Sequence, residues 1–331
     1  MTDLSKGRIL VTGGAGFIGS ALIWDLNRRG VKDILIADFL RHNEKWKNLA
    51  ALQFSDYIEA DNLLHRIEQS PQLLNTVTTV FHLGACTSTT ETDAAYLIRN
   101  NFEYTKALAH FALEGGRRFV YASSAATYGS LESSLPETVA LETLRPLNMY
   151  AFSKHLFDRY AQNAGILSQI TGLKYFNVFG PNEDHKGDMR SVVHKAFHQV
   201  QETGRISLFK SYRPEFPDGA QRRDFMYVKD AAAATIFLAE HVNGDGLFNI
   251  GSGETTTWLD LANAIFNALE REPHIDFIDM PETLRGKYQY YTLANIGKLR
   301  AAGFTQAITP LNESVSDYIH NYLLPGRRLG G

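Results

Sequence analysis

The first half of the chain alternates between short β-branched runs and longer stretches with apolar residues at helical spacing. The strand-like runs cover residues 8–12, 33–38, 77–82, 117–123 and 171–178. The helical patterns cover residues 16–29, 92–114 and 150–164. Strands that alternate with helices in this way form βαβ units on a parallel sheet that is buried on both faces. The pattern therefore predicts a doubly wound, Rossmann-like α/β fold.

The alternation becomes less regular after about residue 178. Gly180 and Pro181 interrupt the pattern, and a polar loop to residue 187 and a Pro/Gly-containing loop over 212–221 follow. The later predicted elements are a strand over 224–228, a helix over 229–240, a strand over 247–250, and helices after Thr257 and Thr309. We expect one domain over residues 1–178, joined by returning segments near 224–250, and a smaller C-terminal lobe over 179–331.

Composition narrows the class of protein. The chain has 331 residues, of which 44% are hydrophobic and 21% charged, as in ordinary globular proteins. Thirty-three basic and 36 acidic residues leave a formal net charge of -3, without the basic field that favours nucleic-acid or membrane binding. No secretory signal pattern precedes the first strand, and the longest apolar run, residues 231–239, is too short to span a bilayer. With a single cysteine, these features predict a soluble cytoplasmic protein without disulfides.

Metal and thiol chemistry are not expected. Cys86 has no base partner at a suitable spacing, so we expect it to pack as a small side chain. The 11 histidines show no His-Glu-x-x-His or comparable ligand spacing. One cysteine also excludes a Cys-based zinc site.

The run after the first predicted strand is rich in glycine and leads directly into a helical pattern. Glycines lie at positions 13, 16 and 19, and Asp38 ends the next predicted strand. Gly13 permits a tight turn, Gly16 lets the backbone approach a pyrophosphate, and Gly19 lets the helix pack closely on the strand. The helix N-terminus offers free N–H groups to the phosphates. This context predicts a dinucleotide-binding loop.

Asp38 bears on the choice between NAD and NADP. An aspartate here binds the adenosine ribose of NAD, and it repels a 2′-phosphate by roughly 3 kcal/mol per unit charge at about 6 Å and an effective dielectric of about 20. Arg41, Lys45 and Lys47 follow it, either to cancel this repulsion or as ordinary surface residues. The residues alone leave NAD and NADP open.

Tyr150 and Lys154 stand one turn apart in the predicted helix over 150–164. A lysine ammonium about 4 Å away would lower the tyrosine pKa from about 10 toward neutrality, a change of roughly 4 kcal/mol at an effective dielectric of about 20. Ser124, near the end of a predicted strand, can hydrogen-bond a sugar oxygen beside the tyrosine. A Tyr-x-x-x-Lys sequence alone is common by chance, but this combination favours acid/base chemistry.

The glycine loop and the Tyr-x-x-x-Lys pair belong to a larger set of motifs. The others are Ser-Ser-x-x-x-Tyr-Gly over 123–129, Arg-Asp-Phe-x-Tyr-Val-x-Asp over 223–230 and Phe-Asn-Ile-Gly-Ser-Gly over 248–253. Together they resemble the extended short-chain dehydrogenase/reductase superfamily, the NAD-dependent epimerases and dehydratases. Within it, the chain resembles the 6-epimerases of ADP-L-glycero-D-manno-heptose. The stretches that carry this second resemblance are residues 82–91, 175–181, 185–187 and 286–289.

The resemblance implies a bound NADP, an ADP-sugar substrate and a homo-oligomer. The cofactor positions that it implies, together with the glycines of the loop, are Gly13, Gly16, Phe17, Ile18, Gly19, Asp38, Phe39, Lys45, Leu83, Gly84, Ala85, Cys86, Thr87, Asn100, Lys154 and Val178. The substrate positions are Ser88, Asn177, Lys186, Phe209, Arg223 and Tyr288. The acid/base groups are Tyr150 and Lys186, supported by Ser124 and Lys154. The chain departs from the family at Asp188, where a serine is usual, and in a longer loop after Phe209.

The reaction that the resemblance implies is epimerisation at C6 of ADP-D-glycero-β-D-manno-heptose to the L-glycero epimer, for the lipopolysaccharide core. Hydride leaves C6, the exocyclic carbon presents its other face, and the same hydride returns. This turn moves the C6 oxygen away from a single fixed tyrosine. A second acid/base group, Lys186, meets that geometric need.

One other function stays open, and two more are disfavoured. A 4-epimerase of the same superfamily needs Tyr150 with Ser124 and no second base. A 4,6-dehydratase is disfavoured, because Ala125 and Ala126 occupy the place of that family's Asp-Glu pair. A catalytically silent NADP-binding regulator is also disfavoured, since it would not need the tyrosine–lysine pair.

Overall fold

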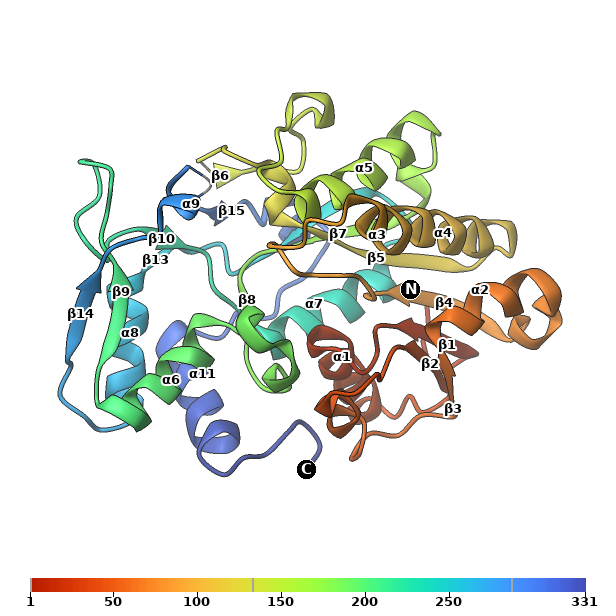
Figure 1. Cartoon of the computed structure of the whole chain (residues 1–331). Coiled ribbons are helices and arrows are strands. Elements are labelled where there is room, and N and C mark those ends of the chain that lie inside the picture. Colours follow the sequence, from red (N-terminus) through yellow and green to blue (C-terminus); the bar gives the residue numbers. More distant parts are fainter. Residues whose placement is uncertain (1, 133, 287) are drawn as a thin grey trace.

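A seven-stranded parallel sheet forms the centre of the computed structural model, which describes residues 2–132, 134–286 and 288–331 (Figure 1). The strand order is β12-β7-β5-β4-β1-β2-β3, and every neighbouring pair is parallel. The strands are β1 (Arg8–Thr12), β2 (Ile34–Asp38), β3 (Asp56–Glu59), β4 (Val77–His82), β5 (Arg118–Ser124), β7 (Thr171–Tyr175) and β12 (Gly246–Ile250). The order reverses at β1, and ligands bind beyond the carboxyl ends of the strands at such a switch point.

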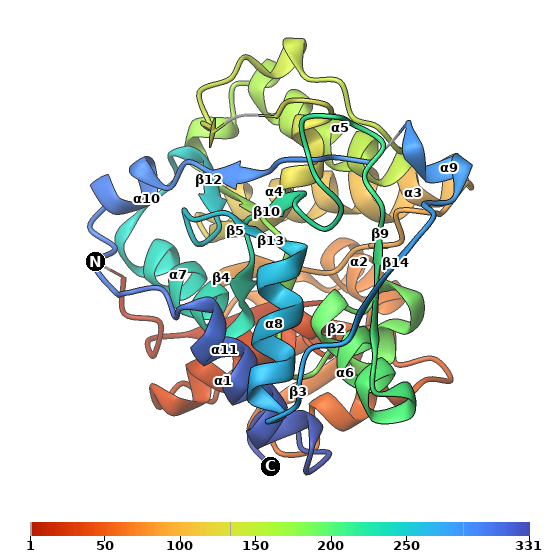
Figure 2. The ribbon, with the colours of Figure 1, turned by 90° about the vertical axis from the view of Figure 1, so that its left-hand side faces the viewer.

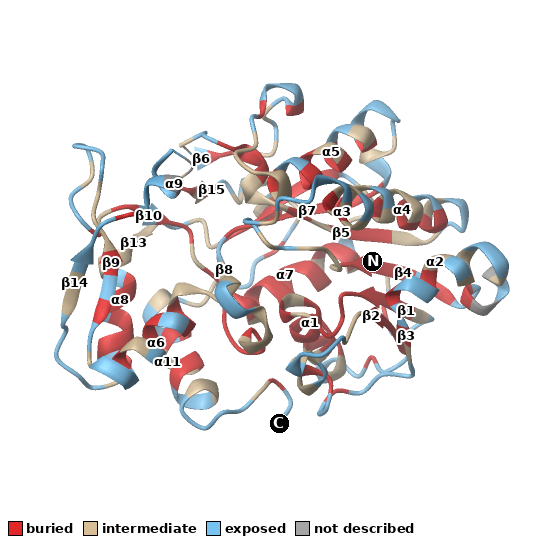
Figure 3. Cartoon of the chain, viewed as in Figure 1, coloured by how far each residue is buried: buried red, intermediate tan, exposed pale blue. Residues whose placement is uncertain are grey.

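Helices cover both faces of the sheet, which confirms the predicted doubly wound α/β fold. Ile9 and Val11 of β1 face one core cluster, and Leu10 between them faces the other. The helices in the first cluster are α1 (Phe17–Arg28) and α7 (Val228–His241). Those in the second are α2 (Ala60–Gln69), α4 (Tyr104–Glu114) and α5 (Met149–Asn163). Figure 3 shows the central strands, α1 and α7 as largely buried.

The strand predicted over 171–178 is wrong in its extent. β7 ends at Tyr175, and the Phe176 N–H donates to the carbonyl of Ile250 (2.9 Å). The chain then leaves the sheet and pairs β8 (Val178–Phe179) with β11 (Met226–Tyr227) in a separate parallel ribbon. This departure carries the chain from the sheet toward the smaller lobe.

The helix predicted over 92–114 is confirmed from Ala94 to Glu114, but it contains a wide turn that was not predicted. It consists of α3 (Ala94–Leu97), a π-helical turn (Ile98–Glu103) and α4. The wide turn holds Asn101, whose side chain bonds the N–H (2.8 Å) and the carbonyl (2.9 Å) of Cys86. Such π turns are frequent at functional sites. Here the turn fastens the helix to the loop after β4.

Further elements form a smaller lobe with its own core cluster, which faces the viewer in Figure 2. Its main elements are α6 (Val192–Thr203), β9 (Ile206–Phe209), α8 (Trp258–Ala268), β14 (Ile275–Ile278) and α11 (Leu311–Tyr318). The shorter elements of the chain are β6 (Ser134–Leu135), β10 (Arg222–Arg223), β13 (Thr256–Thr257), α9 (Glu282–Arg285), β15 (Leu293–Ala294) and α10 (Gly297–Ala301). Leu135 of β6, Ala294 of β15 and Leu299 of α10 pack in the core clusters of the sheet. Within the described residues, no helix is long and apolar enough to cross a membrane.

Candidate active site and cofactor cavity

The glycine-rich loop turns sharply between β1 and α1. Gly13 has a φ of 71°, and a Cβ at this position would lie 2.5 Å from the Gly84 nitrogen. A Cβ at Gly19 would lie 2.1 Å from the Gly13 carbonyl oxygen, closer than atoms can approach. The loop therefore needs glycine at both positions, and it holds the start of α1 at the carboxyl end of β1.

A cavity of about 400 Å³ lies at this loop. Its lining contains most of the predicted cofactor residues, namely Gly13, Gly16, Phe17, Ile18, Gly19, Asp38, Phe39, Lys45, Leu83, Gly84, Ala85, Cys86, Thr87 and Asn100. Ser88 and Lys186 line it too. Lys154 and Val178 lie outside the lining; Val178 packs with Phe17 in the cluster beneath it. The geometry fits a dinucleotide, while the individual contacts stay predictions.

The negative charge of the Asp38 carboxylate is balanced by hydrogen-bond donors and a lysine within the cavity. The carboxylate accepts hydrogen bonds from the Ala15 N–H (2.8 Å), the Phe39 N–H (2.7 Å) and the Lys45 ammonium. Arg41 lines the same cavity in a left-handed backbone conformation, with a φ of 49°. These two cations offset the negative charge that would otherwise repel a 2′-phosphate.

His185 is a cavity residue to which the sequence assigned no role. Its imidazole Nδ1 lies 3.3 Å from the side-chain nitrogen of Asn48. Burial and the nearby charges of Lys45 and Lys186 lower the His185 pKa to about 4. The ring is therefore neutral at pH 7 between two lysines. The sequence feature that could have identified His185 is its place in the His-Lys-Gly stretch. The other lining residues that the sequence did not single out for this site are Thr12, Ala37, Asn43, Ala60, Tyr96, Tyr104 and Met189.

Tyr150 and Lys154 lie on α5, and Ser124 ends β5 beside them. The buried Lys154 ammonium donates to the carbonyl of Ala122 (2.9 Å). The expected lowering of the tyrosine pKa by Lys154 is wrong for this structure, because burial raises the pKa of Tyr150 and a hydrogen bond with Ser124 only opposes that rise. Burial also lowers the pKa of Lys154 to about 8. Both side chains are thus shifted toward their neutral forms.

Asn101 connects α5 to the wall of the cavity. Its side chain accepts from the Cys86 N–H (2.8 Å) and donates to the Ser153 hydroxyl (3.0 Å). Ser153 precedes Lys154 on α5, and Cys86 lines the cavity. Asn101 therefore bonds both the residue before Lys154 and a residue of the cavity wall.

Lys186 reaches the same cavity from the 3-10 segment η7 (Asp184–Met189). Its ammonium lies 4.9 Å from the centre of the Phe17 ring, in a cation–π contact. Burial lowers the Lys186 pKa, and the charge of Glu183 opposes this effect. Without the resemblance, a lysine in this polar loop would pass as a solvated residue. The structure places it against the first residue of α1.

A second group of predicted residues surrounds Arg223. The buried guanidinium donates to the carbonyls of Arg222 (2.9 Å) and Gln289. It lies over the rings of Trp258 (5.6 Å) and Tyr288 (5.1 Å), and the Trp258 N–H donates to the Tyr288 hydroxyl (2.7 Å). Trp258 was not predicted, because only folding brings α8 to this site. The arrangement holds one cation between two aromatic side chains.

The other predicted substrate residues lie near this group. Asn177 donates to the carbonyl of Asp224 (2.9 Å), the residue after Arg223. The Phe209 carbonyl at the end of β9 accepts from Gln221 (3.4 Å). Four predicted substrate residues lie outside the lining of the cofactor cavity, namely Asn177, Phe209, Arg223 and Tyr288. Lys287, in the 286–289 stretch, lies outside the described residues.

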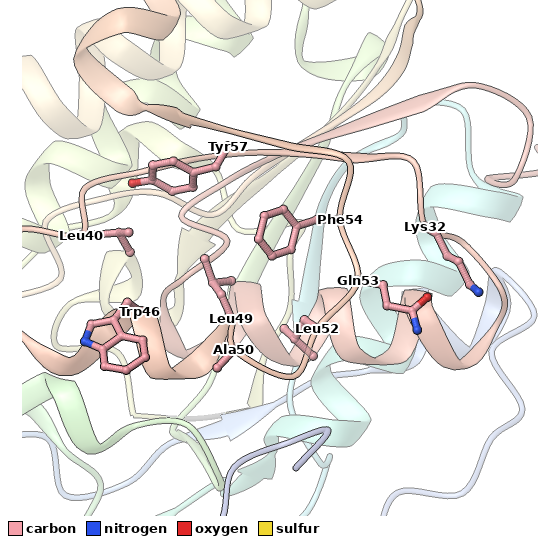
Figure 4. A pocket seen from close by; sticks show the side chains of 9 residues that line it. All are labelled: Lys32, Leu40, Trp46, Leu49, Ala50, Leu52, Gln53, Phe54 and Tyr57. Carbon is pink, nitrogen blue, oxygen red and sulfur yellow. The ribbon is translucent and has the colours of Figure 1, made fainter.

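A separate groove of about 700 Å³ lies outside this site (Figure 4). Its lining residues are Lys32, Leu40, Trp46, Leu49, Ala50, Leu52, Gln53, Phe54 and Tyr57. None of them is a predicted site residue. Among the described residues, no group of three or more His, Cys, Asp or Glu side chains is arranged to hold a metal ion.

The chain is similar to known epimerases over nearly its whole length. It is 49% identical over 316 residues to the ADP-L-glycero-D-manno-heptose-6-epimerase of Nitratidesulfovibrio vulgaris, covering 95% of this chain and 97% of that one. It is 45% identical to the enzyme of the same name from Fusobacterium nucleatum, covering 95% and 98%. The crystal structure of the Helicobacter pylori enzyme of that name has the same fold, with a TM-score of 0.81, 24% identity and coverage of 97% and 98%. The model of the NAD dependent epimerase/dehydratase family matches residues 9–251, and with these relatives it shows that the chain belongs to that family.

Proposed function

We propose that the protein epimerises C6 of ADP-D-glycero-β-D-manno-heptose to the L-glycero epimer, with tightly bound NADP. The names of relatives at 45% and 49% identity support the reaction. The observation that carries the proposal is that Lys186, from η7, lines one cavity with the dinucleotide loop. Residues 1–178, with returning segments near 224–250, hold the cofactor, and residues 179–331 mainly hold the substrate. We also propose that the protein is a cytoplasmic homo-oligomer and that it supplies heptose for the lipopolysaccharide core.

The cavity residues fit a nicotinamide dinucleotide, and NADP in particular. The glycine loop holds the start of α1 at the cavity through close backbone packing that a side chain at Gly13 or Gly19 would prevent. The free N–H groups of a helix start are suited to a pyrophosphate. Lys45 compensates Asp38, and Arg41 adds a second positive charge to the lining. When bound, the nicotinamide supplies the acceptor and donor of the C6 hydride.

The pKa shifts of Tyr150 and Lys186 have opposite consequences for proton transfer. Burial raises the pKa of Tyr150, so the phenol keeps its proton at neutral pH and can give it to the C6 oxygen. Burial lowers the pKa of Lys186, which makes its neutral amine more accessible as a proton acceptor. Environments that separate two titratable groups in this way define an acid and a base. In the reverse direction the two residues exchange roles.

Ser124 and Lys154 position the tyrosine side of the site. Ser124 hydrogen-bonds Tyr150, and its backbone position at the end of β5 keeps this contact at the edge of the sheet. Lys154 holds its ammonium on the Ala122 carbonyl, two residues before Ser124. Both contacts join α5 to the same strand end.

Arg223 fits the anionic part of a sugar nucleotide. A guanidinium is suited to phosphate oxygens because it offers several donors in one plane. The rings of Trp258 and Tyr288 hold this group in place and exclude water from its faces. Asn177 lies beside it through its hydrogen bond to Asp224. These residues form the proposed binding site for the ADP-sugar diphosphate.

Conversion of purified ADP-D-glycero-D-manno-heptose tests the function directly. The two 6-epimers are separated chromatographically, and the nucleotide released from denatured protein is identified. We expect an equilibrium mixture of the epimers and NADP as the released nucleotide. No 6-epimerisation, together with conversion of a nucleotide sugar at C4, would replace the proposal by a 4-epimerase. Release of NAD alone would overturn the choice of cofactor.

A further inference from the structure

Residues 328 and 329 pack against the underside of the cofactor cavity. The chain end marked C in Figure 1 lies near α1, and Leu329 is buried in a cluster with Phe17, Ala21 and Val228. Phe17 lines the cavity on its other side and carries the Lys186 ammonium over its ring. Leu329 thus supports the ring on which the lysine rests.

Arg328 joins the two loops that bring cations into the cavity. Its Nε donates to the Asn48 side-chain oxygen (3.0 Å), at the end of η1 (Glu44–Asn48), the segment that carries Lys45. Its Nη2 lies 3.5 Å from a carboxylate oxygen of Asp184, at the start of η7, the segment that carries Lys186. A hydrogen bond with His194 and the charge of Arg328 lower the Asp184 pKa to about 2, so the pair is charged at neutral pH.

Asn48 extends this connection to the glycine loop. Its buried side-chain nitrogen lies 3.0 Å from the Ala15 carbonyl, 3.0 Å from the Asn182 carbonyl and 3.3 Å from the His185 ring. The amide of Asn48 therefore touches the glycine loop and the approach to η7, while its oxygen holds Arg328.

Asn182 provides a second attachment. Its backbone has a φ of 78°, and its side chain accepts from the Leu329 N–H (2.9 Å) and donates to the Ser20 hydroxyl (2.9 Å) of α1. The turn before η7 is thus bonded to both α1 and the segment that contains Leu329. A short 3-10 segment with a glycine at a φ of 55° gains its fixed position from these external bonds.

We propose that Arg328 is a positioning residue that fixes the Lys186 segment and the cofactor-binding loops relative to each other. The inference rests on the proposed function for the role of Lys186. It assigns to Arg328 an effect on the reaction and on cofactor retention, although the residue lies outside the cavity lining. Arg328 contacts both the Asn48 amide and the Asp184 carboxylate, and so connects the segments that carry Lys45 and Lys186.

Two adjacent arginines provide a matched test. Arg327 is exposed and Arg328 is partly buried, so Arg327→Gln controls for the loss of one charge in this segment. Nucleotide retained per purified chain and the rate of heptose epimerisation are measured for both variants. We expect Arg328→Gln to lose at least half of its nucleotide and at least tenfold in rate, with Arg327→Gln within twofold of the parent. Equal values for the two variants would overturn the proposal.

A double-mutant cycle separates positioning from general destabilisation. If Arg328 acts through Lys186, adding Arg328→Gln to Lys186→Met lowers the residual rate per bound nucleotide by less than twofold. Losses that multiply would show a merely structural role and contradict the proposal. Arg328→Lys keeps the charge toward Asp184, and we expect it to recover part of the rate. If Arg328→Gln does not fold, Arg328→Lys replaces it in both comparisons.

Failure of the proposed function gives a different result. A parent protein that does not convert the heptose refutes the reaction, but retained nucleotide still compares Arg328→Gln with Arg327→Gln. A difference in retention would then support the link between Arg328 and the cofactor loops. Equal retention would reject it.

Discussion

The two proposed acid/base groups are held in place by different means. Tyr150 lies on α5, a helix attached to the central sheet through buried charges. Lys186 lies on a short 3-10 segment whose bonds run to loops and to Arg328. Tyr150 is therefore positioned by the central sheet and its helix, whereas the position of Lys186 depends on contacts between distant parts of the chain.

Asp158 is the centre of the α5 attachment. Its fully buried carboxylate accepts from the hydroxyls of Tyr121 (2.8 Å) and Ser123 (2.7 Å) and pairs with the Lys174 ammonium (3.2 Å). Tyr121 and Ser123 belong to β5, and Lys174 belongs to β7. One turn of helix separates Asp158 from Lys154, so this network fixes the helix that carries the tyrosine–lysine pair.

Loss of the Asp158 partner has the largest expected effect on stability. Lys174→Met leaves a buried carboxylate without its cation, which costs about 3–5 kcal/mol of unfolding free energy. Urea unfolding of the parent and the variant measures this change. Lys32→Met removes an exposed lysine and should stay within about 0.5 kcal/mol of the parent. A Lys174→Met loss below about 1 kcal/mol would show that the pair does not anchor α5.

Replacement of Lys154 should impair the tyrosine side of the reaction. Lys154→Met removes the ammonium that is held at Ala122, and we expect a rate loss of about 10²-fold with weaker nucleotide retention. Epimer conversion and nucleotide content are measured on the same preparation. An unchanged rate at neutral pH would remove Tyr150 and Lys154 as a working pair.

The pH dependence reports on the charge of Lys154. Its lowered pKa of about 8 means that the ammonium is present below pH 8 and is lost as pH rises through that value. The charge of Asp158 raises this pKa, so Asp158→Asn combined with Lys174→Met should move the alkaline loss of activity to lower pH, by about one pH unit. Arg159→Gln, on the exposed face of the same helix, should leave the pH of the alkaline activity loss unchanged. If the double variant loses activity at the same alkaline pH as the parent, the Asp158 network does not set the pKa of Lys154.

Replacement of Lys45 has the smallest expected effect of these changes, a shift in the preference for NADP over NAD. Lys45→Met leaves Asp38 uncompensated, and we expect retention of NADP relative to NAD to fall about tenfold, or roughly 1.4 kcal/mol. Reconstitution with equal NAD and NADP, followed by release and chromatography, measures the ratio. Lys47→Met is the control, because Lys47 pairs with Glu44. Equal ratios in the two variants would contradict the role of Lys45.

Local patterns predicted six of the seven sheet strands and the glycine loop, because strand alternation and glycine spacing are visible within a few residues. They also placed Tyr150 and Lys154 on one helix face. They missed the short edge strand β3. The contact between Arg223 and Trp258 could not be predicted in this way, since it joins separate elements after folding. The same holds for the contacts of Arg328, which depend on the positions of three distant loops. The raised pKa of Tyr150 was missed because burial is a property of the fold.

The rate of heptose epimerisation by Tyr150→Phe and Lys186→Met tests the two-sided site most directly. Each variant should lose about 10²- to 10⁴-fold in rate, since each removes one positioned acid/base group. Nucleotide content and the unfolding midpoint should stay close to those of the parent, because neither phenol nor ammonium anchors the core clusters. Lys6→Met, which removes a lysine whose side chain is 83% exposed, serves as the matched control. A Lys186→Met rate within about tenfold of the parent would contradict the two-base account and leave an epimerase that works with Tyr150 alone.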